Sequence, residues 1–207
     1  SGIDFSLARG GTIAGTVTTG GSPVQWIKVE VIDGSGNLVG SDQTGADGEY
    51  VTTAVPAGTY YLKTVNLSGY IDEVYDNLPC VGATCPDETT GTAVAVTVGS
   101  STGGIDFDLT LGGAITGTVT DAMSAAPLVN VGVSIFNAAG SPVAATTTDA
   151  SGIYGVPQLP AGTYYATIPS PGGNYLPQLY SGIYCSGCTV TTGTPIAVTV
   201  GTTTPNI

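Results

Sequence analysis

The chain contains no histidine, and only three of its 207 residues are basic. Without histidine, the Ser–His–Asp and Cys–His forms of nucleophile activation are excluded, as are His-ligated metal sites. Nucleic-acid binding needs several Lys or Arg residues on one face, and anionic membranes attract basic segments. A net charge of −12 is unfavourable for both. We therefore expect neither an enzyme nor a nucleic-acid-binding protein.

Long apolar runs are also missing, so we expect no membrane span in this segment. The chain begins with Ser1 and shows no signal peptide, which predicts a mature or excised portion of a larger protein. Glycine is abundant, with 32 residues, and 42% of the residues are hydrophobic. The chain can therefore bury a core and is not a disordered tail.

Short runs of Val, Ile, Thr and Tyr alternate with turn residues, which is the all-β pattern. In residues 26–33, for example, Ile27, Val29 and Val31 should lie on one face, and Trp26, Lys28 and Glu30 on the other. About seven strands in about 100 residues is typical of an Ig-like sandwich. The strands expected in the first half are 12–19, 26–33, 38–44, 49–55, 59–65, 93–98 and 105–109.

An internal repeat organises the chain. Residues 3–7 (IDFSL) recur as 105–109 (IDFDL), an offset of 102. Insertions and deletions between the copies fall in loops, as expected for two copies of one sandwich. We predict two domains, residues 1–103 and 104–207. The other matching blocks are 10–18 with 112–120, 57–61 with 161–165, 70–80 with 175–185, and 95–99 with 197–201.

Side-chain alternation along the strands predicts the core. Aliphatic and tyrosine side chains at alternate positions should point inward in each copy. In the first copy these are Val29, Val31, Tyr50, Tyr60, Leu62, Val94, Val96 and Val98, and in the second Ile115, Val119, Val131, Val133, Ile135, Tyr154, Tyr164 and Val198.

The second copy carries a recognisable motif series in residues 113–120, 127–135, 148–154 and 159–164 (LPAGTY). The series resembles the carboxypeptidase regulatory-like repeat, a transthyretin-like (prealbumin-like) sandwich similar to B-type repeats of Gram-positive collagen adhesins. The first copy departs from it at Val55, which replaces the leucine. The resemblance implies two tandem Ig-like sandwiches acting as spacers, stalks, adhesin repeats or appendages of secreted hydrolases. It is specific for fold and unspecific for function.

Two cysteine pairs, Cys80 with Cys85 and Cys185 with Cys188, occupy the same loop of each copy. A four-cysteine zinc site would need ligands from two separate domains, and a redox Cys-x-x-Cys lacks its usual βαβ setting. We favour a local disulfide in each copy, which implies an oxidising compartment. The expected location is therefore extracellular or at the cell surface, of bacterial type.

Carboxylates flank the first cysteine loop, and oxygen ligands of this kind can hold Ca²⁺. No Asp-x-Asp-x-Asp-Gly spacing is present, and the second copy has Pro177, Gln178 and Ser181 at three matching places. We favour a solvated surface and expect no cofactor, with calcium as the minority hypothesis. Its candidate ligands are Asp72, Glu73, Asp76, Asp87 and Glu88.

Tyrosines surround both cysteine loops. If these tyrosines are exposed, they could stack on sugars or on a neighbouring subunit. Packing of the long connection onto the sheet is the favoured interpretation. The candidate binding aromatics are Tyr70, Tyr75, Tyr175, Tyr180 and Tyr184.

The phase of the repeat bears on assembly. The chain opens with the Ile-Asp-Phe block, and its sequence ends at Ile207, where the second copy's own closing block would follow. The chain is either an excerpt from a longer array, or residues 1–9 provide an edge strand shared with another module by β-strand addition. The candidate donor residues are Ile3, Asp4, Phe5 and Leu7.

These observations predict a non-catalytic structural repeat, a stalk, spacer or filament segment whose partners are neighbouring copies or further repeats. The alternatives are a glycan- or surface-binding adhesin module and an accessory domain of a secreted hydrolase. The flanking sequence would separate the last of these from the others.

Overall fold

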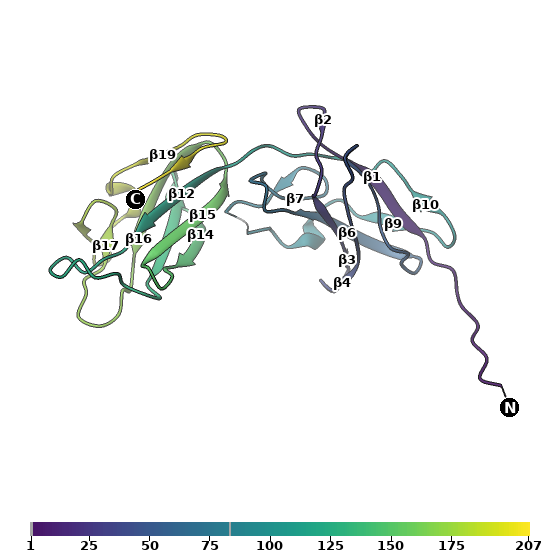
Figure 1. Cartoon of the computed structure of the whole chain (residues 1–207), viewed down its shortest axis with the longest axis horizontal. Helices are drawn as coiled ribbons and strands as arrows, with labels where there is room; N and C mark the ends of the chain where they lie inside the picture. Colours follow the sequence, from purple (N-terminus) through teal and green to yellow (C-terminus); the bar gives the residue numbers. More distant parts are fainter. Residues whose placement is uncertain (1, 83) are drawn as a thin grey trace. The chain divides into compact units, whose positions relative to one another are not determined.

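The computed structural model describes residues 2–82 and 84–207, which fall into two compact units. Unit 1 contains residues 2–68, 72–79 and 85–110, and unit 2 contains residues 69–71, 80–82, 84 and 111–207. Both units are built from β-strands, and the described residues include only two short 3₁₀ segments besides them (Figure 1). The predicted all-β class, with two Ig-like sandwiches, is confirmed.

Unit 1 has two layers. One sheet has the order β4-β3-β6-β7-β8, with β9 paired to β6, and the other is built around β1, which pairs with β10, β11, β2 and β5. The elements are β1 (Thr12–Thr19), β2 (Ser22–Pro23), β3 (Lys28–Asp33), β4 (Leu38–Gln43), β5 (Glu49–Val51), β6 (Gly58–Val65), β7 (Glu73–Val74), β8 (Leu78–Pro79), η1 (Glu88–Thr90), β9 (Val94–Val96), β10 (Ser101–Thr102) and β11 (Phe107–Asp108).

Unit 2 repeats this plan. Its larger sheet has the order β14-β13-β16-β17-β18, with β19 paired to β16, and its smaller sheet has the order β15-β12-β20. The elements are β12 (Gly113–Thr118), β13 (Gly132–Asn137), β14 (Pro142–Thr147), β15 (Ile153–Leu159), β16 (Gly162–Ile168), β17 (Gln178–Leu179), β18 (Ile183–Tyr184), η2 (Val190–Thr192), β19 (Ile196–Val198) and β20 (Thr203–Thr204).

The core of each unit lies between its two sheets and follows the expected alternation. In β3, Val29 and Val31 are fully buried, whereas Trp26, just before the strand, is 62% exposed. The inward positions predicted in both copies are buried, with two exceptions.

The exceptions are Val98 and Val119. Val98 is 60% exposed because β9 ends at Val96 and the chain then turns at Gly99, which has a φ of +70°. Alternation predicts burial only while the backbone stays extended. Val119 is half-buried and follows the end of β12.

The structure also moves the expected domain boundary. Residues 104–110, assigned from the repeat phase to the second domain, belong to unit 1, because β11 pairs with β1. Conversely, residues 69–71 and 80–82 belong to unit 2, where Tyr70 forms a bridge with Leu111 and Val81 packs against the core. At both places, the sequence repeat to which these residues belong is therefore not the structural unit to which they belong.

Candidate functional site

The segment 105–109 closes unit 1 by lying along the edge of β1. Phe107 pairs with Val17 and Asp108 with Thr18, in parallel orientation. The segment is also held at both ends, because the Ile105 N–H donates to the Ala14 carbonyl at 3.2 Å and the Leu109 N–H donates to the Thr18 carbonyl at 2.7 Å. Unit 1 therefore gains an additional strand on its smaller sheet.

The side chains of this closing strand alternate between core and solvent. Ile105, Phe107 and Leu109 are buried, with exposed fractions of 8%, 3% and 1%. Asp106 Oδ1 accepts hydrogen bonds from the Thr16 N–H at 2.8 Å and from the Thr16 hydroxyl at 2.9 Å. Burial of each large apolar side chain stabilises the unit by about 1.5–3 kcal/mol.

Two tyrosines of unit 1 contact the closing strand. The ring of Phe107 packs edge-on against Tyr75, with 5.7 Å between ring centroids. The Tyr50 hydroxyl donates to the Ile105 carbonyl at 2.6 Å. Burial raises the pKa of Tyr50 well above its ordinary value, so this hydroxyl remains a donor.

Unit 2 has a groove of about 200 Å³ at the matching place. Ile207 occupies the position of Ile105: its N–H donates to the Thr116 carbonyl at 3.1 Å, and its carbonyl accepts from the Tyr154 hydroxyl at 2.6 Å. Burial raises the pKa of Tyr154 to about 12. The groove continues beyond Ile207 and is lined by Thr118, Val119, Thr120, Val133, Tyr154, Ala166, Thr167, Ile168, Gln178, Leu179, Tyr180, Ser181, Gly182 and Ile207.

The groove corresponds to the place that Phe107 and Leu109 fill in unit 1. Tyr180 lines it and matches Tyr75 in the repeat. Val119 also lines it and is half-buried, whereas its counterpart Val17 is fully buried. The lining carries no charged side chain. This surface can therefore take an apolar strand, and it holds no group suited to general acid or base chemistry at neutral pH.

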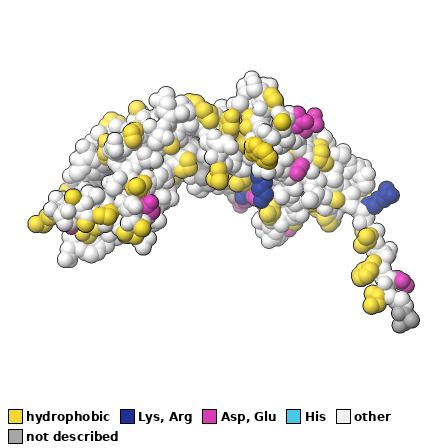
Figure 2. Space-filling view, in the orientation of Figure 1, with side chains coloured by type: hydrophobic (Ala, Val, Ile, Leu, Met, Phe, Trp, Pro, Cys, Tyr) yellow, Lys and Arg dark blue, Asp and Glu magenta, His cyan; other side chains and the backbone are white. Residues whose placement is uncertain are grey.

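The proposed donor residues lie in an extended segment before β1. Ile3, Phe5 and Leu7 are 87%, 85% and 90% exposed, and Asp4 is exposed as well. Residues 2–10 have no assigned strand, and Figure 2 shows hydrophobic side chains along this segment. A regular series of exposed apolar side chains is typical of a surface that binds a partner.

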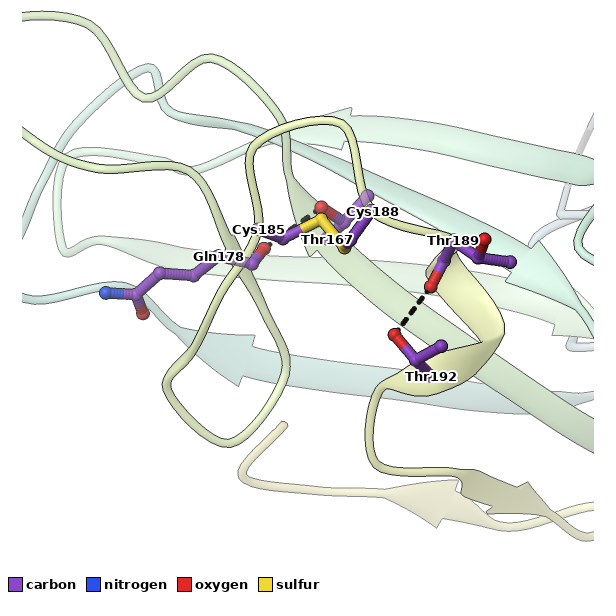
Figure 3. Close-up of a disulfide and its surroundings, with 6 residues drawn as sticks. All are labelled: Thr167, Gln178, Cys185, Cys188, Thr189 and Thr192. Atoms are coloured by element: carbon purple, nitrogen blue, oxygen red, sulfur yellow. Dashed lines mark hydrogen bonds between the residues drawn. A yellow bond between two sulfur atoms is a disulfide. The ribbon is translucent and has the colours of Figure 1, made fainter.

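The cysteine loops hold disulfides. Cys185 and Cys188 are bonded to each other, with their Cα atoms 5.3 Å apart (Figure 3). Cys80 and Cys85 are disulfide-bonded too, and no described cysteine is free. The second disulfide closes the loop after β18 and directly precedes η2, where the Thr192 hydroxyl donates to the Thr189 carbonyl at 2.8 Å.

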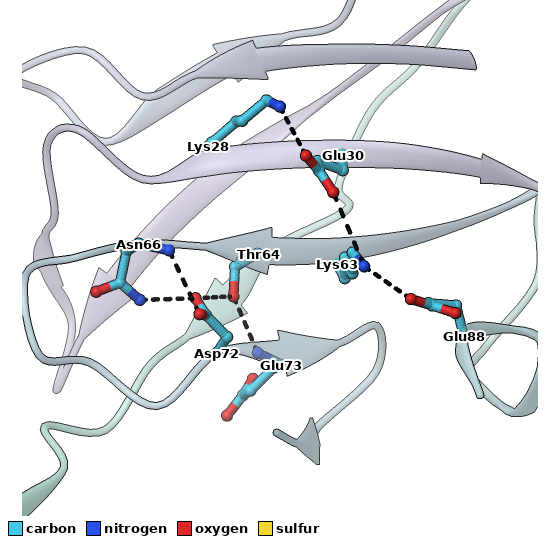
Figure 4. Close-up of polar contacts among 8 residues, drawn as sticks. All are labelled: Lys28, Glu30, Lys63, Thr64, Asn66, Asp72, Glu73 and Glu88. Carbon is cyan, nitrogen blue, oxygen red and sulfur yellow. Dashed lines mark hydrogen bonds and ion pairs between the residues drawn. The ribbon is translucent and has the colours of Figure 1, made fainter. Parts of the chain in front are cut away.

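The five calcium candidates are not gathered into one site. Asp72 is buried and accepts from the Asn66 amide at 2.6 Å and from the Thr64 hydroxyl at 3.2 Å (Figure 4). Asp76 is exposed and accepts from the side chain of Asn77. Among the described residues, no group of three or more His, Cys, Asp or Glu side chains could hold a metal ion.

The two candidates on η1 have structural partners. Asp87 caps this 3₁₀ segment by accepting from the Thr89 hydroxyl at 2.7 Å and from the Thr89 N–H at 2.9 Å. These two hydrogen bonds lower the pKa of Asp87. Glu88 pairs with Lys63 at 2.7 Å, and the hydrogen bond from Lys63 lowers the pKa of Glu88. Lys63 also lies 3.9 Å from Glu30 (Figure 4).

Glu73 was expected on a solvated surface but is only 8% exposed. Its Oε2 is buried without a hydrogen-bond partner in the structure. Burial, followed by repulsion from Asp108 and Asp76, raises the pKa of Glu73 to about 7. Unit 2 has the neutral residue Gln178 at the same position, but Gln178 is exposed, so the repeat gave no signal of this burial.

The candidate binding aromatics do not form one cluster. Tyr75 packs on Phe107, Tyr180 lines the groove, and Tyr70 is half-buried at its bridge to Leu111. Tyr184 is 59% exposed. Tyr175 is 43% exposed, and its hydroxyl donates to Asp121 Oδ2 at 2.9 Å.

The family model for the carboxypeptidase regulatory-like domain matches residues 114–205. This match covers most of unit 2, and unit 1 is its sequence repeat with the same strand plan. The expected family resemblance is therefore confirmed by the match in unit 2.

Among solved structures, the chain is similar to the Bacillus anthracis TIE protein, with 19% identity, 86% of this chain covered and a TM-score of 0.35. It spans 32% of that protein. The minor pilin GBS52 of Streptococcus agalactiae has 12% identity, with 94% and 92% of the two chains covered and a TM-score of 0.36. The shaft pilin SpaA of Lactobacillus rhamnosus GG has 12% identity, with 86% and 95% covered and a TM-score of 0.35.

A search of curated proteins found no match. Among the described residues, no helix has the length and apolar character needed to cross a membrane.

Proposed function

We propose that this chain is a non-catalytic, extracellular structural repeat, a segment of a stalk, spacer or filament whose modules are joined end to end by β-strand addition. The observation that carries this proposal is the position of residues 105–109. They precede β12 in sequence as residues 3–7 precede β1, at the same offset of 102. Yet they complete the sheet of unit 1.

The leading strand of one repeat thus serves as the closing strand of the module before it. A strand shared in this way links successive modules through backbone hydrogen bonds as well as through the covalent chain. A module that needs a strand from its neighbour to complete its sheet is expected in a tandem array. An isolated enzyme domain would gain nothing from such a shared strand.

The chemistry of the surface supports a structural role. The groove in unit 2 has no charged side chain, and the sequence has no histidine to activate a nucleophile. The disulfides support an oxidising, extracellular location. Family membership of unit 2 agrees with a module that accompanies other domains.

Small-angle scattering of the 207-residue chain tests this function, together with electron microscopy of proteins that carry more copies of the repeat in tandem. We expect a rod-like particle whose length grows in equal steps with each added repeat. A compact particle with the units packed side by side would contradict a stalk or spacer.

A second candidate is a glycan-binding adhesin module. The observation in its favour is the exposure of Tyr184 and Tyr175, since exposed tyrosines can stack on sugar rings. A glycan array probed with the wild-type chain and a Tyr184→Ala variant separates the two functions. Binding that is lost in Tyr184→Ala would support the adhesin; an array without signal would remove it.

A further inference from the structure

We propose that unit 1 carries a binding site for a neutral oligosaccharide, in which a sugar ring stacks on Trp26 and polar groups of β3 and β4 bind its hydroxyls. Trp26 is the single tryptophan of the chain, and it is 62% exposed just before β3. An exposed indole face can stack on a sugar ring. The site goes beyond the structural role proposed above and uses none of the tyrosines of the adhesin alternative.

The backbone at Trp26 is strained. Its φ of +68° lies in the left-handed region, which bulky side chains rarely adopt. The equivalent residue of unit 2 is Asn130, with a φ of +57°, and asparagine tolerates this conformation. The two turns are equivalent because the Trp26 N–H donates to the Thr44 carbonyl at 3.1 Å and the Asn130 N–H donates to the Thr148 carbonyl at 3.0 Å. The turn therefore needs no tryptophan, and such strain is typical of functional sites.

The chain on both sides of Trp26 is firmly held. Thr44 is only 1% exposed, and its hydroxyl donates to the Val24 carbonyl at 2.7 Å. The same hydroxyl accepts from the Ile27 N–H at 3.0 Å, and Ile27 is fully buried. A backbone fixed before binding loses little conformational entropy when a ligand arrives, which favours affinity.

Hydrogen-bonding side chains lie beside Trp26. The Gln43 side chain is exposed, and its Nε2 donates to the Trp26 carbonyl at 3.4 Å. Gln43 is also the partner of Lys28 in the pairing of β3 with β4. The Lys28 side chain is 42% exposed, and its Nζ donates to Glu30 Oε1 at 2.6 Å. Together these side chains offer N–H donors and oxygen acceptors, which are the groups that orient a sugar through its hydroxyls.

Unit 2 shows that the sandwich does not need these polar side chains. Its larger sheet has the same strand order, and Gly132 pairs with Thr147 where unit 1 pairs its lysine with its glutamine. The position of the glutamate is held by Ser134. The polar set and the tryptophan therefore occur together in unit 1 without a structural requirement for either, as expected for a binding site.

The charges of this face favour a neutral ligand. Lys28 pairs with Glu30, and Lys63 pairs with Glu88 at 2.7 Å and lies 3.9 Å from Glu30, so the charges of the row compensate one another (Figure 4). A nucleic acid or an acidic polysaccharide would need basic side chains that are not already paired, and the net charge of −12 repels both. Sugar hydroxyls carry no charge, and they both donate and accept hydrogen bonds.

Fluorescence of the single tryptophan tests the site directly. The 207-residue chain is titrated with neutral oligosaccharides, namely cello-, malto-, chito-, xylo- and manno-oligosaccharides, and with polygalacturonate and heparin as acidic probes. We expect a saturable change in tryptophan emission with at least one neutral sugar and weaker binding of the acidic probes. The absence of a saturable change with every neutral sugar, or a preference for an acidic probe, would overturn the proposal. So would an emission change that depends on protein concentration alone, because a second copy of the chain would then cover Trp26.

Matched variants take their residues from unit 2. Trp26→Asn introduces the residue that unit 2 has at this backbone conformation, so it should melt at the wild-type temperature or above. Calorimetry should show that it binds the sugar roughly tenfold or more weakly, as expected when a central tryptophan is removed. Gln43→Thr, which introduces the type of Thr147, should also weaken binding. Wild-type affinity in both variants would contradict the site even if one of them proved unstable.

The control variant is Tyr184→Ala, which should bind the sugar with wild-type affinity. Loss of binding in Tyr184→Ala but not in Trp26→Asn would place the sugar on the tyrosine surface of the adhesin alternative and refute the Trp26 site. The outcome is separate from that of the stalk function. A rod-like particle that binds no neutral sugar would refute only the Trp26 site, and a compact particle that binds sugar through Trp26 would refute only the stalk.

Discussion

The Tyr50 hydroxyl donates a 2.6 Å hydrogen bond to the carbonyl oxygen of Ile105, and the repeat reproduces this contact between Tyr154 and Ile207 at the same distance. The tyrosine stands in the core of each sandwich and reaches the start of the closing strand. Core packing and strand closure are therefore coupled through one side chain in each unit. The predictions below follow from this coupling and from the groups around it.

Replacing either tyrosine by phenylalanine should loosen the closing segment. Tyr50→Phe leaves the buried Ile105 carbonyl without its donor, which should cost about 1–3 kcal/mol of unfolding free energy. Tyr154→Phe should cost less, because Ile207 is only partly buried. Urea denaturation checks both values. As a control, Tyr61→Phe, which changes a half-buried tyrosine on β6, should alter the free energy of unfolding by under about 0.5 kcal/mol.

Gly15 allows the closing strand to approach β1. A Cβ at this position would overlap the Ile105 carbonyl oxygen, and one at Gly117 would overlap that of Ile207. Gly15→Ala should therefore displace the strand and destabilise unit 1 by about 3 kcal/mol or more, since the burial of Phe107 and Leu109 is lost. Gly132→Ala, in open space on β13, is the matched control and should be nearly neutral. Thermal unfolding with no difference between these variants would contradict the close approach.

Glu73 should make unit 1 less stable as the pH rises. Its folded pKa of about 7 lies above the ordinary value of 4.5, so the folded state binds the proton more tightly. Stability contributed by this proton is complete below about pH 4.5 and is lost as the pH rises through about 7. Glu73→Gln, the residue type of unit 2, should be more stable than wild type at pH 8, by roughly 3 kcal/mol at most.

The pH dependence of the difference between the two proteins is the decisive measurement. Unfolding of wild type and Glu73→Gln should give similar free energies at pH 4 and diverge towards pH 8. A constant difference across this range would show that Glu73 does not titrate in the folded protein. Asp47→Asn, which replaces an exposed carboxylate, is the control and should leave the wild-type profile unchanged.

The Cys185–Cys188 disulfide should stabilise unit 2 modestly, because it closes a very short loop. Chain entropy predicts a loss of about 2 kcal/mol for the Cys185→Ser, Cys188→Ser double variant. Denaturant unfolding, with and without reductant, checks this value. Reductant also breaks the disulfide of Cys80 and Cys85, so the wild type and the variant should be equally stable when both are reduced. A loss above about 5 kcal/mol in the variant would mean that the loop has a larger role than pinning the connection after β18.

Much of the fold could be predicted from local pattern. Alternation in β3 placed Val29 and Val31 inward, because a strand turns successive side chains to opposite faces. Alternation failed at Val98, where a turn had already ended the strand. The five separated carboxylates near the first cysteine loop looked like one group in sequence, and the fold gave several of them separate partners.

By itself, the sequence determined the repeat, the sandwich class and the identity of the block that precedes each repeat, because these depend on local periodicity and on self-similarity. Only the tertiary structure decided which strand edge Ile105–Leu109 pairs with, that Glu73 is buried beside it, and that unit 2 presents a matching groove. The reason is physical: strand pairing and burial join residues about 90 positions apart, such as Val17 and Phe107, and no local pattern specifies which edge a strand will meet.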